Sequence, residues 1–170
     1  EFVTCQALYN STTFRLDGLK VADGLQMSQS PYGSLWYKMY TVIRNANTFL
    51  ENIDNTYNIT DEDREWWKAD VKALKAFIYF ELVRRYGPVM IVPDQFDPNQ
   101  EVESLKLPRS HVDTCFNAIV RLCDEAAADL TSLDLKESSR RAYFSKESAL
   151  ALKAIALLYQ ASDLFNGNLD

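Results

Sequence analysis

The spacing of apolar residues along the chain predicts an all-α protein. Over residues 35–53, apolar side chains recur at steps of three and four positions, which is the period of an amphipathic helix. The same period returns over 112–130 and 145–165. A less regular pattern over 1–24 also favours a helix, whereas the polar stretch 23–34 contains glycine and proline and is expected to form a loop.

A long helix is predicted over residues 61–86. Thr60 lies at the N-cap position, and Asp63 completes a Thr-x-x-Asp capping pattern in a first turn rich in carboxylates. The sequence Tyr-Gly-Pro at 86–88 ends the helix, because glycine can adopt a left-handed conformation and proline cannot continue the helix. Four consecutive apolar residues at 77–80 predict packing on more than one side.

Three further features, in this helix and in residues 87–113 after it, lead to specific expectations. The lysines of the first half of the helix recur at steps of three to four residues and predict a solvent-exposed stripe of Lys68, Lys72 and Lys75. The apolar run at 89–92 predicts a lone strand or extended segment inside a loop of about 20 residues, and loops of that length tend to be functional. Ser110 and Asp113 predict a second capping box.

The predicted helices pair into two hairpins, at about 35–86 and about 109–165, which are joined by the long loop. Such hairpins resemble tetratricopeptide (TPR) units, although their spacing is longer than the regular repeat of about 34 residues. Alanines in the last predicted helix allow close approach of a neighbouring helix. We therefore expect a short solenoid of elongated TPR-like hairpins with an extended excursion between them, forming a single domain over 1–170.

Charge and cysteine content exclude several classes. The 24 acidic and 18 basic residues give a net charge of −6, so the chain lacks the basic surface that nucleic acid requires. No apolar run approaches the roughly 20 residues that span a bilayer. Cys115 and Cys123 lie eight positions apart on one predicted helix, roughly 12 Å, too far for a disulfide. The start at Glu1, without a signal-like segment, is typical of an excerpt or a processed product.

The sequence contains no pattern that indicates catalysis. The single histidine, His111, is expected to be a surface residue. There is no Cys-x-x-Cys or histidine pair for a metal, no glycine-rich phosphate loop and no Gly-x-Ser-x-Gly motif. The acidic clusters at 61–63 and 124–129 are explained by helix capping and by a polar helix face. We therefore expect no enzyme, no cofactor and no metal site.

Aromatic and polar residues gather at the junction between the predicted loop 23–34 and the helix that follows. Aromatic rings recognise the C–H faces of sugars, and amides and carboxylates bind their hydroxyls. The junction thus offers candidate ligand-binding residues, namely Asp23, Gln26, Tyr32, Trp36 and Tyr37. An alternative is that Trp36 simply packs its own helix. Tyr57 and Asn58, in the first hairpin turn, are further candidates.

The central motif resembles the signature of the SusD/RagB family. Residues 73–89 read Ala-Leu-Lys-Ala-Phe-Ile-Tyr-Phe-Glu-Leu-Val-Arg-Arg-Tyr-Gly-Pro-Val, similar to the family's aromatic run leading into Leu-Val-x-x-Tyr-Gly and an extended segment. The pattern from Trp36 to Asn47 and the later helices follow in the family's order, so the resemblance covers about 30–165. Lys75 stands where the family usually has arginine, and Met90 where proline is common.

This resemblance implies a lipoprotein on the outer-membrane surface of Bacteroidota-type bacteria. Its partner would be a SusC-like TonB-dependent transporter, and its ligand an oligosaccharide or a peptide, captured without catalysis. Family members are longer, and many carry a lipidated N-terminal cysteine. Cys5 is not preceded by a lipobox, so any anchor would lie outside this chain. Two other hypotheses stay open: a TPR-like adaptor that binds a protein partner without a small ligand, and a helical glycan-processing enzyme.

Overall fold

The computed structural model describes residues 35–94 and 106–166, and the regular structure within those ranges is entirely helical. This confirms the expected all-α class. The predicted helix over 1–24 and the loop over 23–34 lie outside the described residues. The residues group into two compact units, Glu1–Lys38 and Met39–Asp170. The elements are α2 (Leu35–Asn52), the 3-10 helix η1 (Ile53–Asn55), α3 (Asp61–Tyr86), α4 (Val112–Asp129), the 3-10 helix η3 (Ser138–Arg140), α5 (Lys146–Gln160) and α6 (Asp163–Asn166).

Helix α3 begins and ends where its local sequence signals predict. The Asp63 N–H donates to the Thr60 hydroxyl oxygen at 3.1 Å, which confirms the N-cap. At the other end, Gly87 has φ +68° and its N–H donates to the Val83 carbonyl. Only glycine adopts this backbone conformation without steric cost, and Pro88 then prevents the helix from continuing.

The predicted cap of α4 is wrong by one residue. His111, not Ser110, is the N-cap, and its Nδ1 accepts from the Asp113 N–H at 3.4 Å. Ser110 serves the preceding segment instead. Its N–H donates to the Val89 carbonyl at 2.9 Å, and its hydroxyl oxygen accepts from the Ile91 N–H at 3.4 Å. The local pattern favours Ser110 as the cap because these long-range partners are not visible in the sequence.

Helix α5 opens at Ser145 as predicted, with a capping box that Ser148 completes. The expected single helix to about residue 165 is instead interrupted, since α5 ends at Gln160 and α6 follows as a separate turn. The buried face of α5 is also narrower than expected. The spacing of the predicted helix over 145–165 places Ile155 and Leu164 on its apolar side, but Ile155 of α5 is 44% exposed and Leu164, which belongs to α6, is 70% exposed.

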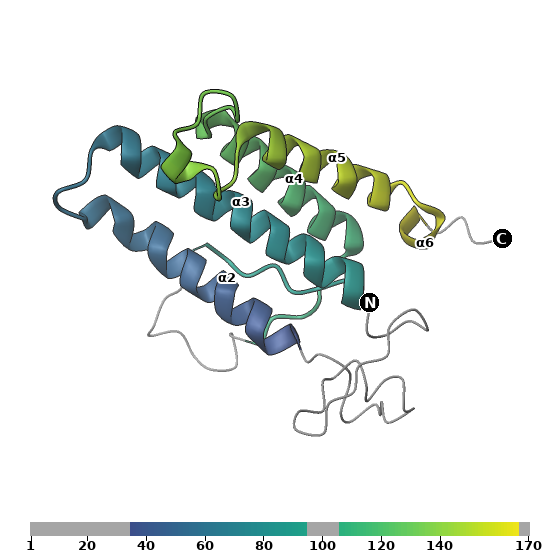
Figure 1. The fold of residues 1–170 in the computed structure, drawn as a ribbon. Coiled ribbons are helices and arrows are strands. Elements are labelled where there is room, and N and C mark those ends of the chain that lie inside the picture. Colours follow the sequence, from purple (N-terminus) through teal and green to yellow (C-terminus); the bar gives the residue numbers. More distant parts are fainter. Residues whose placement is uncertain (1–34, 95–105, 167–170) are drawn as a thin grey trace, which may run out of the picture. The chain divides into compact units, whose positions relative to one another are not determined.

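Helix α4 packs against both α3 and α5, and the three helices run alternately in opposite directions (Figure 1). Short side chains dominate the centre of this stack, so the helix backbones approach closely and one large ring fills the remaining space. This packing confirms the expected TPR-like hairpin architecture. The cluster consists of Trp66, Ala69, Ala73, Ala126, Ala127, Leu130 and Ala149, with the half-buried Trp67 and Phe144 against it.

The connector between α4 and α5 is fixed by two buried charged side chains. Lys136 donates to the carbonyls of Tyr143 and Phe144 at 2.7 and 2.9 Å. Asp70, on α3, accepts from the Phe144 N–H at 2.8 Å. Burial raises the pKa of Asp70 and lowers the pKa of Lys136. The connector is thus attached to α3 through its backbone, which an irregular segment needs when it crosses a helix.

Candidate functional site

Two of the five candidate ligand-binding residues lie in the first turn of α2. Trp36 is half-buried, and Tyr37 is 77% exposed. Consecutive residues of a helix point about 100° apart, so the two rings face different directions. Asp23, Gln26 and Tyr32 lie outside the described residues. The predicted sugar site therefore stays a prediction.

The first hairpin turn contains the other aromatic candidate. Tyr57 is 90% exposed, and the neighbouring Asn58 has φ +62°. Asparagine is one of the few residues that enter the left-handed region at low cost, which explains its position in this turn. Tyr57 is therefore presented to solvent by a turn of defined shape.

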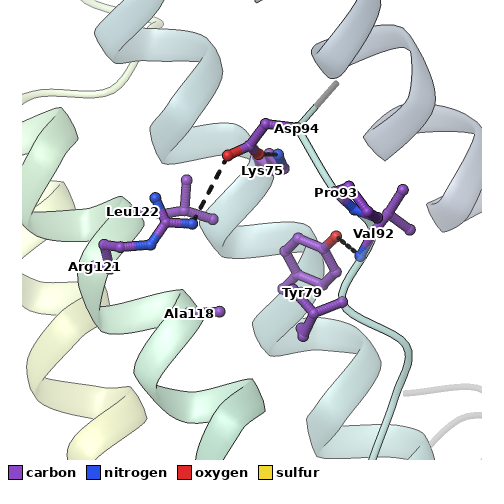
Figure 2. A pocket seen from close by; sticks show the side chains of 9 residues that line it. Lys75, Tyr79, Val92, Pro93, Asp94, Ala118, Arg121 and Leu122 are labelled. Atoms are coloured by element: carbon purple, nitrogen blue, oxygen red, sulfur yellow. Dashed lines mark hydrogen bonds and ion pairs between the residues drawn. The ribbon is translucent and has the colours of Figure 1, made fainter. Parts of the chain in front are cut away.

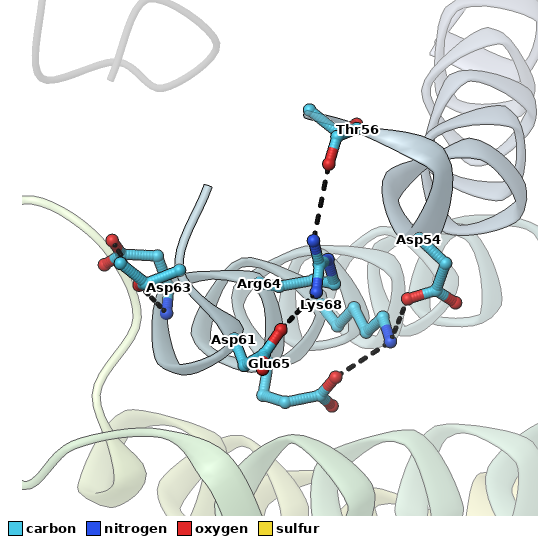
Figure 3. A network of polar contacts seen from close by, with 8 residues as sticks. Asp54, Thr56, Asp61, Asp63, Arg64, Glu65 and Lys68 are labelled. Carbon is cyan, nitrogen blue, oxygen red and sulfur yellow. Dashed lines mark hydrogen bonds and ion pairs between the residues drawn. The ribbon is translucent and has the colours of Figure 1, made fainter. Parts of the chain in front are cut away.

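Ion pairs and caps on the protein surface connect this turn to α3 (Figure 3). Lys68 Nζ lies 2.6 Å from Asp54 and 2.9 Å from Glu65, and hydrogen bonds to both carboxylates raise its pKa. Arg64 pairs with Asp61 at 2.5 Å and donates to the Thr56 carbonyl at 3.3 Å. The carboxylates of this network are exposed, whereas the Arg64 and Lys68 side chains are only 19% and 21% exposed, so the network holds the turn without forming an enclosed site.

A second aromatic group lies near the start of α3 and has a structural role. The rings of Trp66, Trp67 and Tyr143 contact one another edge to face, with centroids 4.7 to 5.4 Å apart. The Arg140 guanidinium lies 4.5 Å from the centre of the Trp66 ring and pairs with Asp63. The Trp66 ring, which is 3% exposed, is thus covered by protein groups, and cation–π and edge-to-face contacts of this kind stabilise packing.

The segment 89–94 is extended, as predicted, and side chains take the place of a neighbouring strand. The Tyr40 hydroxyl donates to the Met90 carbonyl at 2.9 Å and accepts from the Met90 N–H at 3.0 Å. Asn47 donates to the Pro93 carbonyl at 2.9 Å, and the Val92 N–H donates to the Tyr79 hydroxyl at 3.0 Å. The segment is therefore held between α2 and α3, and these backbone groups of Met90, Val92 and Pro93 have side-chain partners.

Burial changes the chemistry of both tyrosines. It raises the pKa of Tyr40 to about 12 and also raises the pKa of Tyr79 well above its usual value. Both hydroxyls are therefore protonated at neutral pH. A protonated hydroxyl can both donate and accept a hydrogen bond, and the Tyr40 hydroxyl does both with the backbone of Met90.

Lys75 corrects the prediction of a solvent-exposed lysine stripe. Lys68 and Lys72 are partly exposed, but Lys75 is only 2% exposed and forms an ion pair with Asp94 (Figure 2). Arg121 of α4 lies 4.0 Å from the same carboxylate. All three lysines share one face of α3, and the segment ending at Asp94 covers only the last of them. No local feature of the sequence indicates this cover.

A cavity of about 170 Å³ lies beside this ion pair, between α3, α4 and the segment 91–94. Figure 2 shows the Lys75 and Asp94 side chains meeting at its rim, with the Tyr79 ring below. Ligand pockets for small molecules usually have volumes of about 300 Å³ or more. The cavity is therefore too small for an oligosaccharide, and its charged groups anchor the extended segment.

The cysteines in the described part of the chain are not activated. Cys115 and Cys123 are buried free thiols; burial raises the pKa of both, that of Cys123 to about 11. Among residues 35–94 and 106–166, no group of three histidine, cysteine or acidic side chains could hold a metal ion. Within the same ranges, no helix has the length and apolarity to cross a membrane.

The architecture places the protein among helical-hairpin scaffolds, and comparison with known proteins identifies its family. Residues 4–158 match the model of a SusD-like family described as starch-binding and associating with the outer membrane. The chain therefore belongs to the SusD-like family. It is also similar to the SusD-like protein P25 of Formosa agariphila, with 31% identity over 119 residues, which is 70% of this chain and 22% of that protein.

Solved structures agree with this assignment. A SusD-like protein of Bacteroides fragilis has 26% identity and a TM-score of 0.71, with 83% of this chain and 27% of that one covered. A laminarin-binding SusD-like protein has the same fold, with a TM-score of 0.72, 22% identity and coverage of 88% and 31%. The chain thus spans about a quarter of the length of the relatives it matches.

Proposed function

We propose that this protein is the glycan-binding component of a SusC/SusD-type uptake system, and that it binds its ligand without turnover. The observation that carries the proposal is the family match over residues 4–158, whose description names starch binding and association with the outer membrane. The laminarin-binding SusD-like protein of the same fold supports a glycan as ligand. The comparisons offer no support for a peptide ligand, so the proposal is restricted to glycans.

The setting of this function follows from the same family. We infer that the full-length protein acts at the cell surface of the outer membrane, beside a SusC-like TonB-dependent transporter, through a lipid anchor outside this chain. The packed centre of helices α3 to α5 would then be scaffold, since its buried charged groups Asp70, Lys136 and Lys75 already have protein partners. The first turn of α2, with Trp36 and Tyr37, would contribute to the ligand site.

The test is calorimetric titration of the full-length protein with soluble starch, laminarin and other neutral polysaccharides. Tyr37→Ala is compared with Tyr57→Ala, because both are strongly exposed tyrosines, one in the first turn of α2 and the other in the turn after η1. We expect saturable binding of one glycan and no change in its chain length. Tyr37→Ala or Trp36→Ala should weaken binding about tenfold, a loss of about 1.4 kcal/mol. Tyr57→Ala should bind as the unchanged protein does.

Each other outcome has a definite meaning. If only Tyr57→Ala loses binding, the ligand site lies at the hairpin turn and the predicted residues are wrong. Shortening of the glycan would contradict binding without turnover. If no glycan binds, the capture hypothesis fails, and the adaptor hypothesis takes its place.

A specific surface favours that second candidate. Helix α5 carries four exposed large apolar side chains, Leu150, Ile155, Leu157 and Leu158. TPR-like hairpins commonly cover such side chains with a further helix or a protein ligand. An adaptor of this kind would show no heat of binding with any polysaccharide in the same titration.

A further inference from the structure

A second pocket lies where α3 ends, next to the first residue of α4 and the short helix α6. Its volume is about 380 Å³, which falls within the range of small-molecule sites. It is more than twice the volume of the cavity beside Lys75. Residues from all three elements contribute to its lining, chiefly Arg84, Arg85, Gly87, Pro88, Leu164 and Phe165.

The pocket is lined by two positively charged guanidinium groups, and only one carboxylate pairs with them. Arg84 Nη2 lies 2.8 Å from the Glu81 carboxylate, and Arg85 Nη1 donates to the same carboxylate and to the Glu81 carbonyl. One carboxylate therefore serves two guanidinium groups. No described residue that lines the pocket is acidic. Both arginines are partly exposed, and these contacts occupy only some of the N–H donors of each guanidinium.

The end of a helix normally disfavours an anion, because its last carbonyl groups carry partial negative charge. Here Arg109 reduces that effect. Its Nη1 donates to the carbonyls of Tyr86 and Pro88 at 3.0 and 2.9 Å. Gly87, between these two residues, has open space where a Cβ would lie, so the backbone forms an uncrowded wall.

The remaining wall is apolar. The Phe165 ring packs edge to face on Phe116 at a centroid distance of 5.2 Å, which anchors α6 to α4. Leu164 and Pro88 add further apolar surface, and Leu164 is largely exposed. The pocket thus combines two guanidinium groups with apolar faces, a combination suited to a ring that carries a carboxylate.

We propose that this pocket binds an anionic sugar residue, a hexuronate within a glycan chain. Arg84 and Arg85 would bind the carboxylate, and Phe165 and Pro88 would contact the C–H face of the pyranose. The inference rests on the proposed glycan-binding function. It adds a charged sugar as ligand, whereas the site proposed at Trp36 and Tyr37 would bind neutral sugars. The net charge of −6 does not oppose it at close range, since charges more than about 8 Å apart are screened at 0.15 M salt.

The test compares two probes that share one sugar chain and differ in whether its carboxyl groups are charged or methyl-esterified. The full-length protein is titrated at 0.15 M salt with tetragalacturonate and with the same tetrasaccharide fully methyl-esterified. Arg85→Gln is the test variant, because Arg84 still pairs with Glu81, and Arg84→Gln is the second variant if the first does not fold. Arg141→Gln is the matched control, an exposed arginine of the connector between α4 and α5.

We expect tetragalacturonate to bind at least about tenfold more tightly than its ester, the effect of one charge-assisted contact. Arg85→Gln should remove about that factor for the acid and leave the ester unchanged, and Arg141→Gln should change neither. Equal affinities for the two probes, no binding of the acid, or an equal loss in the control would overturn the inference. Binding of a neutral polysaccharide without binding of the acid would refute this inference alone. If neither binds, the proposed function fails as well.

Discussion

The connections at the two ends of α3 are held in opposite ways. At its start, the turn from η1 to Thr60 is held by ion pairs with exposed carboxylates, such as that of the partly exposed Lys68 with Asp54 (Figure 3). At its end, the segment 89–94 is held by groups withdrawn from water, including Tyr79 and Lys75 (Figure 2). The same helix therefore supports one connection through its hydrated surface and the other through buried contacts.

The difference shows where the fold depends on individual side chains. Water can replace an exposed ion pair with little loss, since solvent screens the attraction and ordering two long side chains costs entropy. A buried donor or charge has no such replacement, and removing its partner costs the full desolvation penalty. We therefore expect substitutions at the segment 89–94 to have larger effects on the free energy of unfolding than substitutions at the first turn.

The largest effect is expected for Asp94→Ala. This change leaves the Lys75 ammonium, 2% exposed, without its carboxylate, and breaking such a pair from one side should cost about 2–3 kcal/mol. Lys75→Met should cost less than about 1 kcal/mol, because the buried charge disappears, the volume is kept, and the 59%-exposed Asp94 is solvated. Urea unfolding of the two variants measures both values. A larger loss for Lys75→Met would show that the ion pair itself, rather than an unpaired ammonium, determines the cost.

A smaller loss is expected when one buried hydroxyl is removed. Tyr79→Phe keeps the ring but leaves the Val92 N–H without its acceptor, which should cost about 1–2 kcal/mol. Tyr57→Phe removes an exposed hydroxyl and is the matched control, with no expected change. Hydrogen exchange of the Val92 amide should accelerate in Tyr79→Phe alone. Unchanged exchange would mean that another group accepts from this amide.

The sequence predicts the elements better than it predicts which faces they cover. The bounds of α3 follow from Thr60, Asp63 and Gly87, because caps and stops act within a few residues of themselves. The burial of Lys75 could not be predicted in this way. Its spacing from Lys68 places both on one helix face, and only the position of a segment that begins after the helix decides which of the two is covered.

The candidate sites show the same limit. The spacing of Trp36 and Tyr37 at a loop-to-helix junction is a local signal, and it could be read without a structure. The pocket at Arg84 and Arg85 depends on α6, which lies about 80 residues later in the chain. In the sequence alone, the two arginines are a basic pair at the end of a helix, without any sign of the apolar wall opposite them.

A third prediction concerns the capping residue of the first turn. Thr60→Ala removes the acceptor of the Asp63 N–H and should cost about 1 kcal/mol, whereas Thr60→Ser should retain most of the stability. The Thr60 hydroxyl and Arg140 also hold the pKa of Asp63 below its usual value. The stability from this carboxylate is therefore present above its ordinary pKa of about 3.9 and is lost as the pH falls below it. Thr60→Ala should weaken that acid dependence, which urea unfolding at several pH values would detect.

The smallest effect is expected at Lys68, which lies on the same face of α3 as Lys75. Lys68→Ala removes ion pairs to Asp54 and Glu65, yet both carboxylates are exposed and return to water, so the loss should stay below about 0.5 kcal/mol. Salt should reduce even this difference, because it screens exposed pairs. Measurement at low and high salt therefore sharpens the comparison between the two ends of α3. A loss at Lys68 as large as that for Asp94→Ala would show that the turn at the start of α3 depends on its charges as strongly as the segment at its end does.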